Sequence, residues 1–294
     1  MAFLLRCLWL AALAPLGYSA VPVTTNDVAK AIRDGLQAAL RSQGSRLSIE
    51  VPPGAPLALR GETTEAWWKT DDERAKVECG DVALCELVVA LFPLDFKIAC
   101  VYADVSTARR ALKKGVSATR SVSTLPRAGD TKKKAPPPAK GFGAAAVKAR
   151  IWNADLNLQK RCDVVVICGG LDGPGAETVA AASATLGADT AMLLLNTRLP
   201  GLAASGARAN VEAKFVDDFV VAFAMSPPPP PTKNCEGWEA LVVARTYPEP
   251  WIVARPRAIG KPQELGRRET PPTPANTAEL AAIPASLFDS LFNK

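Results

Sequence analysis

Short apolar runs alternate with helix-like segments through the first 217 residues of this sequence, and three more apolar runs then follow with no helix between them. Strands that alternate with helices indicate a mostly parallel sheet. Consecutive strands without helices favour an antiparallel extension at one edge. The early runs are 47–51, 96–102, 163–168 and 191–195, and the late ones are 219–225, 240–245 and 251–254. The pattern predicts a three-layer α/β fold, with a mostly parallel sheet flanked by helices and an antiparallel edge extension.

The helix over residues 24–42 has the clearest pattern. Its apolar residues Val28, Ile32, Leu36 and Leu40 recur every four positions and form one stripe. Either Thr25 or Asn26 is the expected N-cap. Other helices are expected over residues 71–92, 104–114, 174–186 and 207–217.

The complete absence of histidine restricts the chemistry of the chain. Its 294 residues are 48% hydrophobic and 22% charged, which is ordinary for a globular protein with one sizeable core. Without histidine, there is no histidine general acid or base, no Ser-His-Asp or Cys-His nucleophile and no histidine metal ligand. No C-x-x-C pair occurs either, so zinc and thioredoxin-like sites lack support. We therefore expect no cofactor, no metal and no catalysis.

The net charge of +6 comes from one segment. Residues 113–150 carry ten Lys or Arg against a single acid, so they sum to +9 and the rest of the chain sums to −3. The segment is rich in Lys, Pro and Gly, a composition that resists folding. We expect a solvated, disordered insertion, with contact to anionic lipid or RNA as the alternative. Since the positive charge is not spread over a face of the fold, nucleic acid is not an expected partner.

The first 20 residues are typical of a signal or targeting peptide. Arg6 is the only charge, a short apolar run covers residues 7–16, and Gly17 with Ser19 fits a cleavage site. An uncleaved anchor and a buried first helix are the alternatives. A single domain is expected over residues 21–256. Residues 257–294 are expected to form a flexible tail, and its short amphipathic end could dock on the domain, a partner or a membrane surface.

The stretch from Cys168 to Gly175 is the most enzyme-like part of the chain. It contains Gly169, Gly170 and Gly173 between a strand and a helix, where backbone N–H groups and the helix dipole can hold an anion. It matches neither G-x-G-x-x-G nor a P-loop, so a plain tight turn is the competing interpretation. Asp172 and Glu177 lie at the helix start, a position that attracts acids in any helix, and are not assigned a catalytic role.

Asn196 and Arg198 follow the strand over residues 191–195. Ligands of α/β sheets bind at the carboxyl ends of parallel strands, and a guanidinium can grip an anion bidentately. Both residues are candidates for ligand or partner binding. The alternative is that Asn196 closes a turn with its side chain.

The cysteines leave the compartment open. Cys100 and Cys168 lie in apolar runs and are expected to be buried small hydrophobes. Cys79, Cys85 and Cys235 are the candidates for redox pairing.

Several motifs, taken in their order along the chain, carry a resemblance to a known family. Near the N-terminus they are Pro22, the amphipathic helix through Leu40 and the run Arg46 to Val51; later they are Leu194 to Asn196 with Arg198, then Phe215, Phe219 and Phe223, and then Arg245 to Pro248 with Trp251. From Pro22 to Pro256 the chain resembles a plastid and cyanobacterial family defined by a domain of unknown function, which includes low photosystem II accumulation protein 3. The resemblance implies a plastid protein that helps membrane complexes to assemble, without known catalysis.

Three functional hypotheses follow. The first is a non-enzymatic plastid accessory factor that contacts proteins, among them thylakoid assembly factors, with peripheral membrane contact through the basic insertion or the C-terminal end. Arg245 and Trp251 join the candidate binding residues on this hypothesis. The second is an enzyme that binds a nucleotide or phosphate ligand through the Gly169–Gly175 loop. The third is a secreted or endomembrane protein.

Overall fold

The computed structural model describes ten stretches of the chain: residues 21–42, 44–54, 73–113, 120–125, 162–171, 173–187, 189–199, 218–231, 235–257 and 261–283. The leader over residues 1–20, the helix expected over 207–217, Asp172 and the C-terminal end beyond 283 lie outside them. Among the residues described, no helix has the length and apolarity needed to cross a bilayer.

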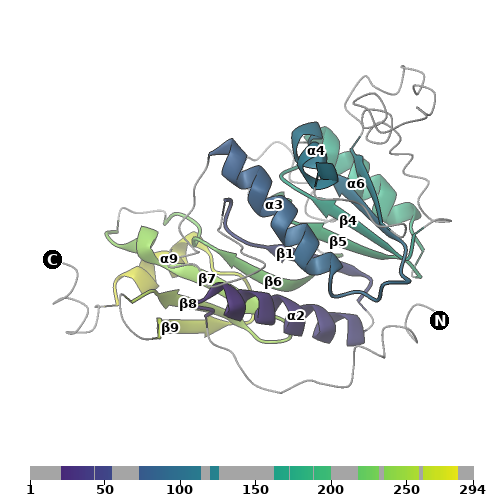
Figure 1. The fold of residues 1–294 in the computed structure, drawn as a ribbon. Helices are drawn as coiled ribbons and strands as arrows, with labels where there is room; N and C mark the ends of the chain where they lie inside the picture. Colours follow the sequence, from purple (N-terminus) through teal and green to yellow (C-terminus); the bar gives the residue numbers. More distant parts are fainter. Residues whose placement is uncertain are drawn as a thin grey trace, which may run out of the picture.

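Nine strands in the described residues form one sheet in the order β3-β2-β4-β5-β1-β6-β7-β8-β9 (Figure 1). The strands from β3 to β6 pair in parallel, and β6 to β9 pair antiparallel. Their bounds are β1 Arg46–Glu50, β2 Ile98–Tyr102, β3 Arg120–Thr124, β4 Val164–Cys168, β5 Ala191–Leu195, β6 Val220–Ser226, β7 Val242–Thr246, β8 Trp251–Arg255 and β9 Gln263–Arg268. The predicted α/β fold with an antiparallel edge is confirmed.

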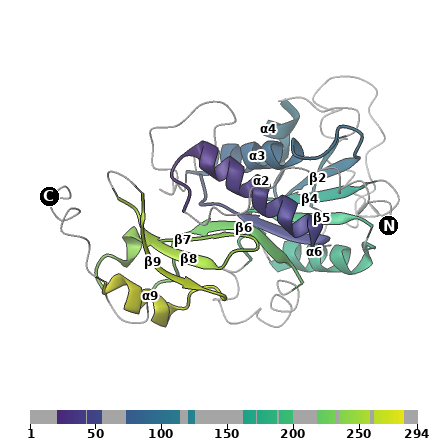
Figure 2. The same cartoon turned by 90° about the horizontal axis from the view of Figure 1, so that it is seen from below.

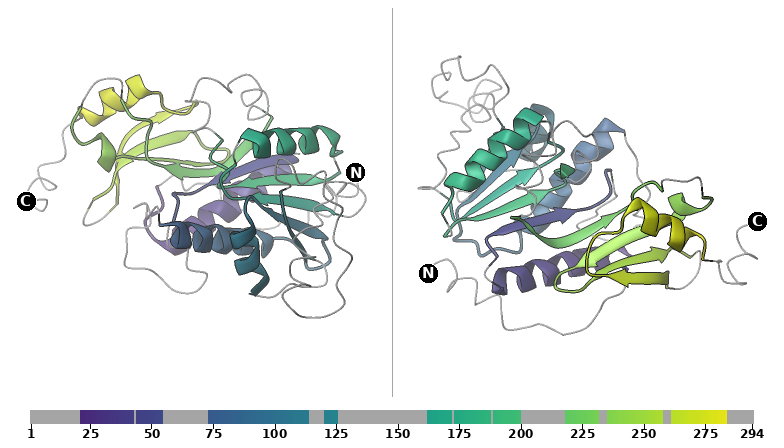
Figure 3. Two further views of the ribbon diagram at one scale, coloured as in Figure 1. Left: turned by 90° about the horizontal axis from the view of Figure 1, so that it is seen from above. Right: turned by 180° about the vertical axis from the view of Figure 1, so that it is seen from behind.

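Helices cover both faces of the sheet. One face carries α2 (Thr25–Arg41), α3 (Arg74–Val89) and α4 (Val105–Lys113), which lie in front of the strands in Figure 1. The opposite face carries α6 (Gly173–Thr185) against the parallel strands and α9 (Pro274–Ala281) against the antiparallel strands, as the rear view of Figure 3 shows. Seen from below in Figure 2, the sheet runs between these two helical layers.

The central strands follow from their composition. All five residues of β2, β4 and β5 are buried, as expected for parallel strands that are covered on both faces. Helix α2 begins with a capping box, in which Thr24 and Asp27 satisfy each other's backbone N–H. Its Gly35 lies against β6, where an added Cβ would overlap the carbonyl oxygen of Ala222. Glycine at this position therefore allows α2 to approach the sheet closely.

Two expected boundaries are wrong. The basic insertion was expected to be disordered over residues 113–150, but residues 120–124 form β3 and pair with β2; residues 126–150 lie outside the described part. The expected flexible tail contains β9, which pairs with β8, and α9, whose Leu280 and Ala281 are buried. Both strands lie at the edges of the sheet, where an apolar sequence is not required, so hydrophobic patterning did not reveal them.

Candidate functional site

Strands β2 and β4 are neighbours whose connections leave in opposite directions. From β2 the chain passes through α4 to the outer strand β3, whereas from β4 it passes through α6, on the other face, to β5. The carboxyl ends of such a pair form the topological switch point, where open α/β sheets bind ligands. Gly169 and Gly170 directly follow β4 at this point.

The turn after β5 has an unusual backbone. Asn196 and Arg198 both have left-handed φ angles, 52° and 55°, which few non-glycine residues adopt. The Asn196 side chain is buried; it accepts a hydrogen bond from Val51 N at 2.9 Å and donates one to Asp81 Oδ1 at 2.8 Å. The Asn196 side chain therefore joins the turn after β5 to the end of β1 and to α3, while the exposed Arg198 leaves its guanidinium at the surface.

Glu50, the last residue of β1, holds this turn through hydrogen bonds to its carboxylate. Its Oε1 accepts hydrogen bonds from Thr197 N at 3.0 Å, Thr197 Oγ1 at 3.1 Å and Arg198 N at 3.2 Å. Loss of hydration, partly opposed by these bonds, raises the pKa of Glu50 to about 7. The carboxyl group thus changes charge near neutral pH while it holds the turn that presents Arg198.

Asp81 approaches the same edge from α3. It is 4% exposed, and burial raises its pKa to about 6, although the Asn196 hydrogen bond and the nearby positive charge of Arg198 lower it. An added Cβ on Gly169 would lie 3.5 Å from Asp81 Oδ2, and one on Gly170 would lie 3.6 Å from Arg198 Cδ. The structure therefore brings together Asp81, Gly169, Gly170 and Arg198.

The glycine loop does not present the row of amides that a phosphate cradle needs. Gly169 N donates to Leu195 O at 2.9 Å, and Leu171 N donates to Thr197 O at 3.1 Å. These bonds tie the loop to the turn after β5. Gly173 is the first residue of α6, and Glu177 lies exposed on that helix.

Arg245 and Trp251 lie on the antiparallel part of the sheet. The Arg245 guanidinium carbon lies 5.5 Å from the centre of the Trp251 ring and 6.0 Å from that of Tyr247. Arg245 Nε also donates to Glu249 O at 3.3 Å. Desolvation lowers the pKa of this half-buried guanidinium. Arg245 thus stacks on aromatic rings instead of extending into solvent.

Strand register places the two groups of candidate residues on one face. Glu50 pairs with Ala224, Ala224 pairs with Arg245, and Trp251 of the next strand pairs with Arg268. Neighbours in register share a face of the sheet, and here it is the face that carries α6 and α9. Since neighbouring strands are about 4.8 Å apart, Arg245 lies two strand spacings from Glu50. The Arg245–Trp251 pair and Glu50 therefore lie on the same face of the sheet, with Arg245 two strands away from Glu50.

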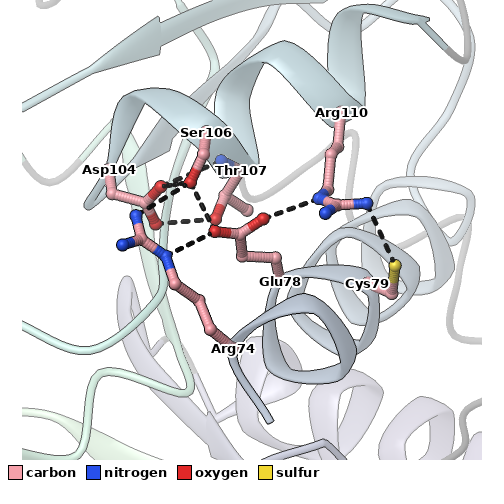
Figure 4. Close-up of polar contacts among 7 residues, drawn as sticks. All are labelled: Arg74, Glu78, Cys79, Asp104, Ser106, Thr107 and Arg110. Carbon is pink, nitrogen blue, oxygen red and sulfur yellow. Dashed lines mark hydrogen bonds and ion pairs between the residues drawn. The ribbon is translucent and has the colours of Figure 1, made fainter.

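A network of charged side chains joins α3 to α4 (Figure 4). Glu78 is buried and accepts hydrogen bonds from Arg74 Nε at 2.9 Å, Arg110 Nε at 2.6 Å and the Ser106 hydroxyl. These partners outweigh desolvation and lower the pKa of Glu78. Asp104 caps α4 by accepting from Thr107 N at 2.9 Å. Because every acceptor here is occupied from within the chain, the network clamps the two helices and is not a ligand site.

The acidic residues of these clusters were not predicted from the sequence. Glu50 ends an alternating strand, and Glu78 and Asp81 lie among the apolar residues of α3. The sequence signal that could have identified Glu78 and Asp81 is the presence of acidic residues in a helix whose neighbouring positions are apolar. In the part of the chain that the structure describes, no group of three or more Cys, Asp or Glu residues could hold a metal ion.

Cys100 and Cys168 are buried, as expected. All six described cysteines, including the three candidates for redox pairing, are free thiols.

The fold and site define an α/β protein with helices on both faces of its sheet and a polar turn at the carboxyl edge. Residues 22–279 match the sequence model of a family described as a domain of unknown function (DUF1995), and the chain belongs to that family. None of the curated proteins matches the chain.

Proposed function

We propose that this chain is a non-catalytic accessory factor of the plastid that acts by binding other proteins, in the manner of a photosystem assembly factor. The resemblance of its motifs to the plastid and cyanobacterial family that includes low photosystem II accumulation protein 3 supports this proposal, and a match to a family described only as a domain of unknown function is compatible with it. The lack of histidine removes the commonest proton-transfer group from the chain. Peripheral thylakoid contact through the basic insertion or the C-terminal end belongs to the same proposal.

The observation that carries the proposal is the Arg245–Trp251 pair. Among the residues described, Arg245 has no ion pair, although it is half-buried and its planar group is oriented by two aromatic rings. Trp, Tyr and Arg are the residues that most often dominate the energy of protein interfaces. A preoriented guanidinium loses little side-chain entropy on binding. We therefore place the protein-binding surface on the antiparallel strands around Arg245.

The test compares two arginine substitutions on the antiparallel part of the sheet, one on β7 and one on β9. Tagged full chains are titrated against solubilised thylakoid complexes, and the bound complexes are quantified. We expect Arg245→Ala to weaken saturable binding about thirtyfold, the effect of losing about 2 kcal/mol at an interface hot spot. Arg267→Ala is the matched control, because Arg267 is exposed on β9 and forms a surface ion pair with Glu264. Equal binding by both variants, with unchanged melting temperatures, contradicts the proposed surface.

Localisation tests the compartment. A fluorescent fusion that carries the intact leader is expected in the plastid, and a secreted or endomembrane signal supports the rival hypothesis. The enzymatic rival with a phosphate-cradling loop is less favoured, because the amides of Gly169 and Leu171 already bind backbone carbonyls.

A further inference from the structure

The topological switch point carries polar groups that the proposed protein contacts do not use. Asp81, Gly169, Gly170 and Arg198 meet there, on a different part of the sheet from the Arg245–Trp251 pair. Two of the four, Gly169 and Arg198, have left-handed backbone angles.

Asp81 supplies a hydrogen-bond acceptor at this edge of the sheet. Its Oδ1 is bound by Asn196 Nδ2, whereas no hydrogen bond to Oδ2 is found within the described residues. The residue is 4% exposed, but Oδ2 is not one of the fully buried polar atoms that lack a partner, so this oxygen keeps contact with solvent. Gly169, whose φ of 101° disfavours any side chain, lies beside it. A donor such as a ligand hydroxyl can therefore take the place of water on Oδ2.

Arg198 supplies a positive charge next to this acceptor. The residue is exposed, and no ion pair of its guanidinium is found in the part of the chain that the structure describes. Its left-handed backbone is held by Glu50, and strained residues of this kind are typical of ligand-binding turns. An added Cβ on Gly170 would lie 3.6 Å from Arg198 Cδ and 3.8 Å from Nη1, so the guanidinium extends over a residue without a side chain. A planar guanidinium in this position suits a phosphate group.

We infer that Asp81, Gly169, Gly170 and Arg198 form a binding site for a small hydroxylated phosphate ester, with Arg198 on the phosphate and Asp81 Oδ2 on a hydroxyl. Tight binding requires both contacts. Inorganic phosphate can bind Arg198 but has no sugar hydroxyl for Asp81, and a free sugar can bind Asp81 but has no phosphate for Arg198. The ester could be a sugar phosphate or a nucleotide, because both carry a hydroxylated ring and a phosphate. The inference does not depend on the protein-binding surface around Arg245.

The experiment measures binding to the full chain by calorimetry. The probes are ribose 5-phosphate, ribose, inorganic phosphate and adenosine monophosphate. We expect ribose 5-phosphate to bind saturably and at least about tenfold more tightly than phosphate or ribose, since each contact contributes about one factor of ten. Tighter binding of the nucleotide than of ribose 5-phosphate identifies a nucleotide site; equal or weaker binding identifies a sugar-phosphate site.

Substitutions separate the two contacts. Arg198→Met is expected to weaken both ribose 5-phosphate and phosphate about tenfold. Asp81→Asn keeps the acceptor for Asn196 and is expected to weaken ribose 5-phosphate alone, to the level of phosphate. Arg33→Met, on the exposed side of α2, is the control and leaves both affinities unchanged. Gly170→Val places a side chain under Arg198 at a position where an added Cβ has room, and it should abolish binding in a folded protein.

Two results overturn the inference. One is the absence of saturable binding of either phosphate ester by the wild-type chain. The other is wild-type affinity in folded Arg198→Met and Gly170→Val variants. Neither result bears on the binding of thylakoid complexes through Arg245, which is measured separately.

Discussion

Glu50 couples the protonation of one carboxyl group to the stability of the turn that carries Arg198. Loss of hydration raises its pKa from 4.5 to about 7, so between these pH values the folded chain holds a proton that the unfolded chain has released. The free energy of unfolding therefore falls as the pH rises through this window. The pKa of Asp81, raised to about 6, adds a fall in the same direction at lower pH.

We predict that Glu50→Gln removes part of this pH dependence. The amide oxygen of glutamine can accept the same three hydrogen bonds, but it carries no charge to desolvate. At pH 8 the variant is expected to be more stable than the wild type, by on the order of 2 kcal/mol, and the gap should narrow at pH 5. Urea unfolding at both pH values measures the difference in the free energy of unfolding between the variant and the wild type. Glu177→Gln, exposed on α6, is the control. A gap that does not change with pH refutes the role of Glu50.

Sequence reasoning located part of this turn and missed the rest for a physical reason. Asn196 and Arg198 were predicted because they follow an apolar strand, and such strands end at the edge where ligands bind. Asp81 was not predicted as a site residue because it lies 115 residues before Asn196, and only the fold brings the two into contact. The direction of the Arg198 side chain depends on a left-handed φ that no residue preference would suggest.

At the scale of elements, Arg46 ties the start of β1 to the end of α6. The half-buried guanidinium donates from Nη1 to Thr190 O at 3.0 Å, and from Nη2 to Ser183 O at 3.1 Å and Leu186 O at 2.7 Å. Its Nε also donates to Ser183 Oγ at 3.0 Å. Carbonyl groups at the end of a helix have no partner within the helix, so this single side chain takes the place of a C-terminal cap.

We predict that Arg46→Met destabilises the fold by about 2–3 kcal/mol, since methionine preserves the apolar stem but leaves these carbonyl groups without a donor. Hydrogen exchange should accelerate most at the end of α6. Arg46→Lys should recover only part of the loss, because an ammonium lacks the planar fork of donors. Arg109→Met, exposed on α4, serves as the control. Uniform exchange along α6 in the methionine variant contradicts the capping role.

The elements predicted correctly are those that must be apolar. Strands β4 and β5 are buried along their whole length, and all of their residues are apolar. Strand β9 reads Gln-Glu-Leu-Gly-Arg-Arg, because an edge strand of an antiparallel ribbon has few buried positions. Helix α9 did leave a local signal that went unused: Thr273 as N-cap followed by Pro274 at the first helical position.

For the whole molecule, the unit that folds extends beyond the boundary at residue 256 that the sequence suggested. Strand β9 supplies hydrogen bonds along β8, and Leu280 and Ala281 of α9 pack with Trp251 and Val253. Arg255 donates to Ala281 O at 3.3 Å. The family match ends at residue 279, within α9.

We predict that a chain ending at residue 257 loses the native antiparallel ribbon, because β8 becomes an open edge and the apolar face around Trp251 and Val253 meets water. The expected result is aggregation, or a melting temperature well below that of the full chain, with loss of thylakoid-complex binding. A chain ending at residue 283 retains β9 and α9 and should melt like the full chain. Thermal unfolding with light scattering distinguishes the two truncations.

If the chain ending at 257 melts cooperatively at the wild-type temperature, β9 and α9 are not required for the fold, and the domain ends where the sequence first suggested. If the chain ending at 257 aggregates or melts early while the chain ending at 283 melts like the full chain, the Arg245–Trp251 surface depends on β9 and α9. The reason is that Trp251 pairs with Arg268 of β9 in the same ladder.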